Sequence, residues 1–444
     1  MTLRLCLDIG VRRFAAGRVL LGGSPTRLVR LQPSGVRLMD DWLAGKPVGD
    51  DPAERALARR MLNSGLMHPL PVPGRFTKTA VTLVIPVRNN RSGLNRLLEA
   101  TADLPRRIVV DDGSDVPIAG ADHRHTTPRG PGGARNSGCG GVTTPLIAFL
   151  DSDCVPEAGW LDAVLPLLDD PDVAAVAPRV RSFATGPVGN YEDSCSSLDM
   201  GPDPAAVRVN GRVRYLPAAA LVVRRTVFQA IGGFDEALRF GEDVDLIWRL
   251  LSAGHMVRYQ PQSVVFHEPR TTVGAWLRQR FDYGTSAAPL AQRHPAHLHC
   301  AYLTRAFALQ CVLAASGHPL AAMVPSILTA TRTARRLRSY QIPARDAAEI
   351  ALNGQLGSLR QVADALRRVW WPLALVSRRG RRLLALAYAL SAITGNAHRR
   401  GVAWPALRAL DDLSYGLGVW AGCLRHRRVE PLIPSFHPFP GGHT

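Results

Sequence analysis

Lysine is nearly absent from this chain of 444 residues. Only Lys46 and Lys78 occur among the 54 basic residues, so arginine carries almost all of the net charge of +18. Arginine suits phosphate recognition, although a GC-rich genome produces the same bias. The charge could serve nucleic acid, an anionic membrane surface or a phosphorylated substrate. No recognition motif for nucleic acid accompanies it, so we expect no nucleic-acid partner.

The chain also lacks the cysteine patterns of disulfide scaffolds and zinc sites. Its seven cysteines form no CxxC pair and are odd in number, which predicts reduced, unpaired thiols. No apolar stretch of signal-peptide length follows Met1, because Asp8, Arg12 and Arg13 come early. These absences predict a cytoplasmic protein. The length predicts two or three domains.

From Val81 onward, short apolar runs alternate with segments of helical spacing. Runs of this length and hydrophobicity are typical of buried strands. The expected strands cover residues 81–85, 108–110, 146–150, 173–177, 215–223 and 264–267. Ser92 is the expected cap of the first intervening helix. The alternation predicts an α/β fold with an open, mostly parallel sheet flanked by helices.

The run 146–150 stops at two carboxylates, Asp151 and Asp153. Ligands bind at the carboxyl ends of such strands, and positions i and i+2 of an extended segment point the same way. Two carboxylates on one side suit a hard divalent cation that also binds phosphate oxygens. The alternative is a solvated turn that caps a helix over residues 157–168.

Other strand ends are also polar. Asp111 or Asp112 could accept a hydrogen bond from a base or ribose, or could form an Asx turn before Gly113. The glycines of residues 130–133 let backbone amides approach a phosphate closely, and Arg135 follows on the next helix. This loop matches neither a P-loop nor a dinucleotide fingerprint.

Two further candidates stand downstream. Asp243 begins an expected helix, where the helix dipole favours a negative side chain and lowers its pKa. The acidic cluster there could equally act as a cap. His267 follows the last apolar run, a place where a single histidine is more often structural than catalytic.

In this order, the motifs resemble the family 2 glycosyltransferases with the GT-A fold. The resemblance covers about residues 80 to 275 and rests on residues 85–90, 110–114, 133–138, 151–153, 232–236, 241–245 and 267. It implies that Asp243 is the general base and that Asp151, Asp153 and His267 hold Mg²⁺ or Mn²⁺. The implied nucleotide-sugar contacts are Pro86, Arg88, Asn90, Asp111, Asp112, Arg135, Asp151 and Glu242. Asn90 departs from the glutamate of many relatives, which puts the contacts of its loop in doubt.

Three domains are expected: residues 1–76, 77–275 and 276–444. The first contains a hairpin over residues 18–31, helices over 35–43 and 54–62, and a proline-rich linker over 67–74. Its pattern resembles the small winged-helix modules that hold a ribosomally made peptide. A structural appendage is the alternative.

The last domain is expected to be helical and arginine-rich. Residues 306–331 contain no charged side chain and are long enough to span a bilayer. Gly317, His318, Pro319 and Pro325 interrupt the run, which favours a buried helix pair or a re-entrant segment. The flanking arginines suit peripheral contact with the inner face of the cell membrane. A helical lid with a solvated basic face is the favoured alternative.

The three domains together resemble the glycosyltransferases of the mycofactocin system, which add glucose units to a redox cofactor derived from a ribosomal peptide. We therefore expect an inverting hexosyltransferase that uses UDP-glucose and a peptide-derived acceptor. One alternative is a non-catalytic binding protein on a transferase fold. Another is a glycosyltransferase that acts on a cell-envelope glycan or lipid. A nucleotidyltransferase would not require the Gly-Glu-Asp helix start.

Overall fold

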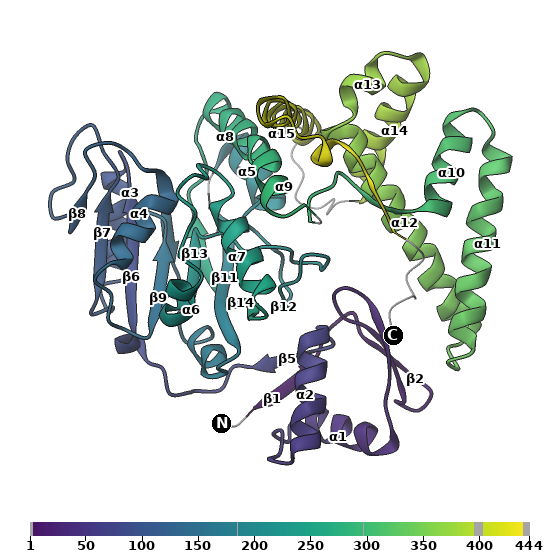
Figure 1. Ribbon diagram of the computed structural model, residues 1–444, viewed down its shortest axis with the longest axis horizontal. Helices are drawn as coiled ribbons and strands as arrows, with labels where there is room; N and C mark the ends of the chain where they lie inside the picture. The colour runs from purple at the N-terminus through teal and green to yellow at the C-terminus, as the bar shows by residue number, and fades with distance from the viewer. Residues whose placement is uncertain (1–2, 184, 296, 395–402, 438–444) are drawn as a thin grey trace. The chain divides into compact units, whose positions relative to one another are not determined.

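The computed structural model describes residues 3–183, 185–295, 297–394 and 403–437. The chain forms two compact units, residues 1–270 and 271–444. Unit 1 holds a small N-terminal module and a large sheet, and unit 2 is mainly helical (Figure 1). Among the helices of the described ranges, none has both the length and the hydrophobicity needed to cross a membrane.

The N-terminal module packs strands against two helices. Its hairpin has the predicted place and forms β3 (Val19–Gly22) and β4 (Arg27–Arg30), with β2 (Arg12–Phe14) on the other side of β3. The predicted helices are α1 (Pro33–Leu43) and α2 (Pro52–Ser64). The expected linker is partly a strand, since β5 (Met67–Leu70) pairs with β1 (Arg4–Leu7). The main-chain hydrogen bonds of β1 hold this segment in place.

The main sheet of unit 1 confirms the predicted α/β architecture. Its strand order is β10-β14-β11-β13-β9-β6-β7-β8, with β12 also paired to β14. The bounds are β6 (Val81–Val87), β7 (Arg107–Asp111), β8 (His123–Arg124), β9 (Leu146–Leu150), β10 (Cys154–Pro156), β11 (Val173–Ser182), β12 (Ala205–Ala206), β13 (Ala220–Arg224) and β14 (Met256–His267). β6, β7, β8 and β9 are parallel, whereas β10, β12 and β13 run antiparallel to their neighbours.

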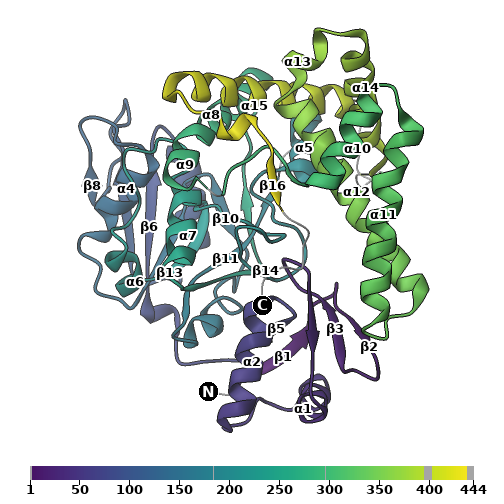
Figure 2. The same ribbon diagram turned by 45° about the vertical axis from the view of Figure 1, so that its right-hand side comes forward.

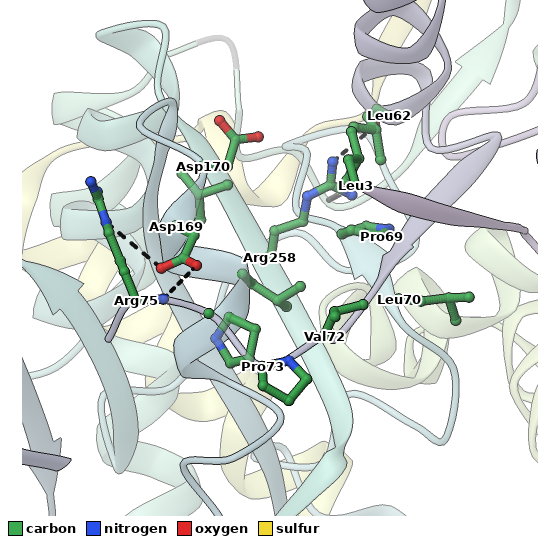
Figure 3. Close-up of a pocket in the computed structure, with 14 residues that line it drawn as sticks. Leu3, Leu62, Pro69, Leu70, Val72, Pro73, Arg75, Asp169, Asp170 and Arg258 are labelled. Atoms are coloured by element: carbon green, nitrogen blue, oxygen red, sulfur yellow. Dashed lines mark hydrogen bonds and ion pairs between the residues drawn. The ribbon is translucent and has the colours of Figure 1, made fainter. Parts of the chain in front are cut away.

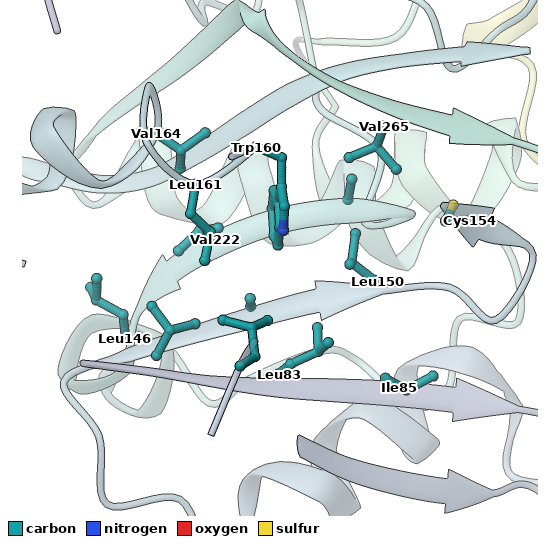
Figure 4. Packing of buried hydrophobic residues seen from close by; sticks show 14 of the residues in the cluster. Leu83, Ile85, Leu146, Leu150, Cys154, Trp160, Leu161, Val164, Val222 and Val265 are labelled. Carbon is teal, nitrogen blue, oxygen red and sulfur yellow. The ribbon is translucent and has the colours of Figure 1, made fainter. Parts of the chain in front are cut away.

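Apolar side chains of the strands form the core of this sheet (Figure 4). Leu83, Leu146, Leu150 and Val222 are fully buried, and Trp160 packs over them from the segment after β10. The expected helix over residues 157–168 is instead a series of turns that ends in a 3₁₀ helix, η2 (Leu165–Asp169). A second 3₁₀ helix, η1 (Lys78–Ala80), leads into β6.

The helices of unit 1 cover the strands. They are α3 (Arg91–Ala100), α4 (Gly130–Cys139), α5 (Gly186–Cys195), α6 (Arg225–Ala230) and α7 (Glu242–Ser252). Asn90, rather than the expected Ser92, caps α3, since its Oδ1 accepts from the amide of Gly93 at 3.1 Å. The α4 helix packs on β6 and β7. Gly138 permits this close approach, because a Cβ there would lie 2.5 Å from Cγ1 of Val84.

Unit 2 is built from helices and one small parallel sheet, β15 (Tyr302–Thr304) with β16 (Ser435–His437). Its helices are α8 (Val273–Thr285), α9 (Ala287–Arg293), α10 (Arg305–Ala315), α11 (Pro319–Arg338), α12 (Ala344–Arg368), α13 (Trp371–Leu375), α14 (Arg378–Thr394), α15 (Trp404–His426) and the 3₁₀ helix η4 (Glu430–Leu432). Glycines let α8 and α15 touch, since a Cβ on Gly284 would lie 2.1 Å from the carbonyl oxygen of Tyr415.

The long uncharged run of unit 2 forms the expected helix pair, α10 and α11, which lie side by side (Figure 2). The expectation that this pair is buried was wrong. Leu309, Leu320 and Ile327 expose 53%, 80% and 56% of their surface. Packing against α12 covers only part of α11, and the remaining apolar face stays open.

Candidate active site

The carboxyl ends of four strands meet at one edge of the main sheet. β6, β7 and β9 are parallel. Because β13 runs antiparallel to both β9 and β11, and β14 is parallel to β11, β14 points the same way. The residues that follow these strands therefore share an edge, as in other α/β sheets that bind ligands at strand ends. They are the loop at Arg88, Asp111, Asp151 and His267.

Arg135 links two of the candidate carboxylates. Its Nη1 donates to Glu242 at 2.8 Å, and its Nη2 donates to Asp151 at 2.6 Å. The side chain is buried and lies over the ring of Phe234. Burial lowers the pKa of Arg135, but Asp151 and Glu242 outweigh it and raise the pKa, so the guanidinium stays charged. Two of its nitrogens are thus engaged by carboxylates, and its predicted contact with the nucleotide sugar stays a prediction.

Asp243 lies on the first turn of α7, beside this pair. It does not cap the helix, because Gly241 is the N-cap residue. Its Oδ1 accepts from the amide of Val244 at 2.8 Å, and its Oδ2 accepts from the amide of Ala218 at 3.3 Å. Burial raises the pKa of Asp243. The expectation of a lowered pKa at the helix start was therefore wrong, since desolvation exceeds the effect of the helix amides.

Glu242, the first residue of α7, is buried beside Asp243. Burial and the charge of Asp243 raise the pKa of Glu242 to about 7, against the opposing effect of Arg135. The cluster of Asp151, Glu242 and Asp243 around one arginine holds three acids and one base. Such an arrangement favours an added cation or proton.

Asp153 and His267 form the second pair at this edge. Their Oδ2 and Nε2 atoms lie 3.6 Å apart, and the His267 Nδ1 is buried without a hydrogen-bond partner. Burial acts against ionisation of both, but their mutual attraction outweighs it, so the pKa of Asp153 is lowered and that of His267 is raised. Both groups also act on the pKa of Asp151. In the described ranges, however, no three acidic, histidine or cysteine side chains are arranged to hold a metal ion.

The two aspartates after β7 hold their own loops. The carboxylate of Asp111 is fully buried and accepts from the amides of Ser114 at 2.9 Å and Ile118 at 3.1 Å. Asp112 accepts from His125 Nδ1 at 2.7 Å and from the amides of residues 129 and 130 at 2.8 and 2.9 Å. These bonds fit the turn-forming alternative, and contact with a nucleotide base stays a prediction for both.

The loop after β6 connects to the Asp151–Asp153 turn. Asn90 Nδ2 donates to the Ser152 hydroxyl at 3.4 Å, while its Oδ1 caps α3. Arg88 is exposed beside it, and Pro86 is buried within β6. An exposed arginine can bind a phosphate, and the donor contact of Arg88 stays a prediction.

The sequence reasoning missed the role of Asn136. Its Nδ2 donates to the carbonyl of Phe234 at 2.9 Å, and the amide of Phe234 donates back to its Oδ1 at 3.0 Å. This pair of bonds fixes the loop before α7 to α4, and so sets the distance between Arg135 and Glu242. The neighbouring residues Gly133–Gly138 marked the segment, but nothing in the spacing indicated which loop it would hold.

A cavity of about 410 Å³ lies away from these strand ends, between the N-terminal module and the main sheet (Figure 3). Its lining includes Leu3, Leu62 and Val72 from the N-terminal part of the chain, and Asp169 and Arg258 from the segments of the main sheet. Arg258 stands near the start of β14, whereas His267 ends that strand. The cavity is therefore separate from the carboxylate cluster.

The sequence model of "Glycosyltransferase like family 2" matches residues 78–282. A curated relative, the "Pre-mycofactocin glycosyltransferase" of Mycobacterium tuberculosis, is 40% identical over 459 aligned residues, which cover 97% of each chain. The chain therefore belongs to the family 2 glycosyltransferases; it is a transferase with the α/β GT-A fold that the motif order predicted.

More distant relatives cover only part of the chain. "Glycosyltransferase AglE" of Haloferax volcanii is 25% identical over 46% of this chain and 71% of its own. Among solved structures, the mannosyltransferase PcManGT from Pyrobaculum calidifontis is 15% identical, with a TM-score of 0.44 over 83% of this chain and 92% of its own.

Proposed function

We propose that this transferase is an inverting hexosyltransferase. It moves a hexose, with glucose from UDP-glucose as the expected unit, to a hydroxyl group of a peptide-derived redox cofactor. The name of the Mycobacterium tuberculosis relative supports a pre-mycofactocin acceptor. The observation that carries the chemistry is the Arg135 bridge, which sets Asp243 beside the strand-end carboxylates.

Asp243 is the proposed general base. Its raised pKa brings its basicity closer to that needed to accept a proton near neutral pH. It takes the proton of the acceptor hydroxyl while that oxygen forms a bond to the anomeric carbon. The bond from this carbon to the diphosphate oxygen breaks on the opposite face, and the diphosphate leaves with the electron pair. One displacement of this kind inverts the anomeric configuration.

The residues at the strand ends have the side-chain types that bind a divalent cation. Asp151, Asp153 and His267 would hold Mg²⁺ or Mn²⁺, and the ion would neutralise the negative charge of the leaving diphosphate. This proposal rests on the carboxylate surplus around Arg135 and on His267 Nε2, which lies 3.6 Å from Asp153 Oδ2. Arg88 and Asn90 lie where they can contact the donor from the neighbouring loop.

The N-terminal module is the proposed guide for a peptide-derived acceptor. It has its own core around Leu20, Met39 and Trp42. A bidentate ion pair ties it to the rest of unit 1, with Arg59 donating to Asp170 at 2.7 and 3.1 Å. A module that is both folded on its own core and fastened to the catalytic sheet suits acceptor positioning.

A donor screen tests this function. The full chain is incubated with nucleotide sugars that differ in base and sugar, with and without acceptor, while nucleotide release is followed. UDP-glucose should give the fastest release, and magnetic resonance of the product should show an anomeric configuration opposite to that of the donor. Retention of configuration would contradict the single displacement, and absence of release from any nucleotide sugar would contradict the function.

A further inference from the structure

An exposed apolar surface of unit 2 is not used by the transferase chemistry. Leu320, Val324, Ile327 and Leu328 of α11 are exposed, and the adjoining α10 exposes Leu309 and Val312; together these residues are called the α10–α11 surface below. Side chains at positions 320, 324, 327 and 328 share one face of α11, because they recur at helical spacing. Large apolar residues that are gathered in this way, rather than scattered, mark an interaction site.

Arginines continue and border this surface. Arg335 and Arg338 lie on the same face of α11, about two and three turns after Leu328, and both are exposed. At the other end, Arg378, Arg379, Arg381 and Arg382 of α14 are exposed. A Cβ on Gly317, in the turn between α10 and α11, would lie 3.7 Å from Nη2 of Arg379. The start of α14 therefore adjoins this turn.

The charge of the surroundings is mainly positive, although Asp346 and Glu349 lie in the first turns of α12, which packs against α11. Residues 283–345 contain no acidic side chain. Residues 271–444 hold 22 arginines and seven acidic residues, and so carry 15 of the 18 net positive charges of the chain. The hydroxyls of Thr329 and Thr331 form hydrogen bonds within α11, since they donate to the carbonyls of Pro325 and Ile327.

We propose that the α10–α11 surface docks on an anionic lipid bilayer. Its apolar stripe enters the boundary between headgroups and acyl chains, and the arginines of α11 and α14 pair with lipid phosphates. The 20 residues of α11 give a helix about 30 Å long that can lie in the plane of the interface. Long arginine side chains keep their charge at headgroup level while the stripe is buried.

A second copy of the chain fits this surface less well. A two-fold interface brings the same patch of each copy together. It would set the arginines of α11 and α14 against their equivalents, and like charges in a contact oppose association. Anionic headgroups supply the missing countercharge, which is why the observations favour a bilayer.

Vesicle sedimentation tests the docking. The full chain should partition onto vesicles of phosphatidylglycerol and phosphatidylcholine, with weaker binding at high salt, and should not partition onto phosphatidylcholine alone. Replacing the stripe by glutamine (Leu320→Gln, Val324→Gln, Ile327→Gln) keeps good helix formers. This variant should lower the partition coefficient by about tenfold or more, and the variant with Arg378, Arg379, Arg381 and Arg382 changed to glutamine should do the same.

Matched controls remove the same chemistry elsewhere. Ile9→Gln, Val116→Gln and Leu424→Gln replace three other exposed apolar residues. Glutamine at the exposed Arg18, Arg30, Arg37 and Arg60 removes four charges from the N-terminal module. Both controls should bind anionic vesicles within about twofold of the unchanged chain.

Hydrogen exchange of the unchanged chain is a second test, and it does not depend on the folding of any variant. Anionic vesicles should slow amide hydrogen exchange of residues 314–324 and leave the N-terminal module unaffected. Equal binding to neutral vesicles, or equal loss of binding in the controls, would overturn the proposal. A third outcome would also overturn the proposal: the unchanged chain binds no vesicles but self-associates, and the glutamine variant of α11 does not self-associate. A second copy of the chain would then cover the surface.

Discussion

At the scale of single residues, Asp151 and Asp153 each have one basic neighbour. Arg135 pairs with Asp151 and with Glu242, and His267 Nε2 lies 3.6 Å from Asp153. Each carboxylate keeps an oxygen for a further ligand, since Asp151 binds Arg135 through Oδ1 and Asp153 faces His267 through Oδ2. These remaining oxygens are the groups that a divalent cation would bind.

A substitution of Asp153 tests the cation. Asp153→Asn keeps the shape and removes the charge, so donor affinity measured by calorimetry should lose its dependence on Mg²⁺ or Mn²⁺. For the unchanged enzyme, a chelator should abolish transfer and either ion should restore it. Asp162→Asn, at an exposed position after β10, is the control and should behave like the unchanged enzyme. Full activity in excess chelator, or metal-dependent donor binding in Asp153→Asn, would remove the metal from the account.

At the scale of elements, α4 and α7 are joined by one buried charge pair. Arg135 comes from α4 and Glu242 from α7, and the Asn136–Phe234 bonds hold the loop between α6 and α7. Burial opposes ionisation of Glu242 and raises its pKa to about 7. The folded chain therefore holds this proton more tightly than the unfolded chain, whose glutamate titrates near 4.5. Stability from this group is present below about pH 4.5 and is lost as the pH rises through about 7.

Glu242→Gln tests this pH dependence. The unchanged chain should lose unfolding free energy between about pH 5 and pH 8, by about 3 kcal/mol at most from this group. Glutamine does not ionise, so the variant should lack that loss. The unfolding free energy of the variant minus that of the unchanged chain should therefore be higher at pH 8 than at pH 5. Chemical denaturation at both pH values measures the difference. A variant that instead loses more stability at pH 8 would show that the Arg135 ion pair outweighs the cost of burial.

At the scale of the whole molecule, the sequence predicted most of the architecture of unit 1. Buried apolar runs located β6, β7 and β9 closely, because a strand covered on both faces needs continuous hydrophobicity. The hydrophobic pattern gave wrong strand and helix bounds where apolar residues lie outside regular secondary structure. Residues 215–219 are apolar but precede β13, which begins at Ala220. Residues 157–168 have helical spacing, but turns pack them over the sheet as an irregular segment.

The position of the candidate residues at the strand ends was more predictable than the geometry between them. Strand ends located Asp151, Asp153 and His267, because parallel strands place their carboxyl ends together. The Arg135 bridge joins residues that are 107 positions apart in sequence, which no local pattern encodes. The bonds of Asp111 are local and fit the turn that the sequence offered as an alternative. The exposure of α10 and α11 could not be predicted either, since an uncharged run has the same sequence whether it is covered or exposed.

The central claim is that Asp243 acts as the base, and Asp243→Asn tests it most directly. The variant keeps an oxygen that can accept from the amide of Val244 or Ala218, so the chain should stay folded. Asp245→Asn is the matched control on the same helix, because its carboxylate is buried and accepts from Arg249 at 2.7 Å. That control should lose about 1–3 kcal/mol of unfolding free energy and keep kcat when folded.

Steady-state kinetics and donor binding are then measured on the same folded preparations. We expect Asp243→Asn to retain its melting temperature and donor affinity, and to lose kcat by about 10²-fold or more. An Asp243→Asn enzyme that folds, binds donor and turns over within a few-fold of the unchanged enzyme would contradict the account, and would leave Asp243 as a holder of the Ala218 loop.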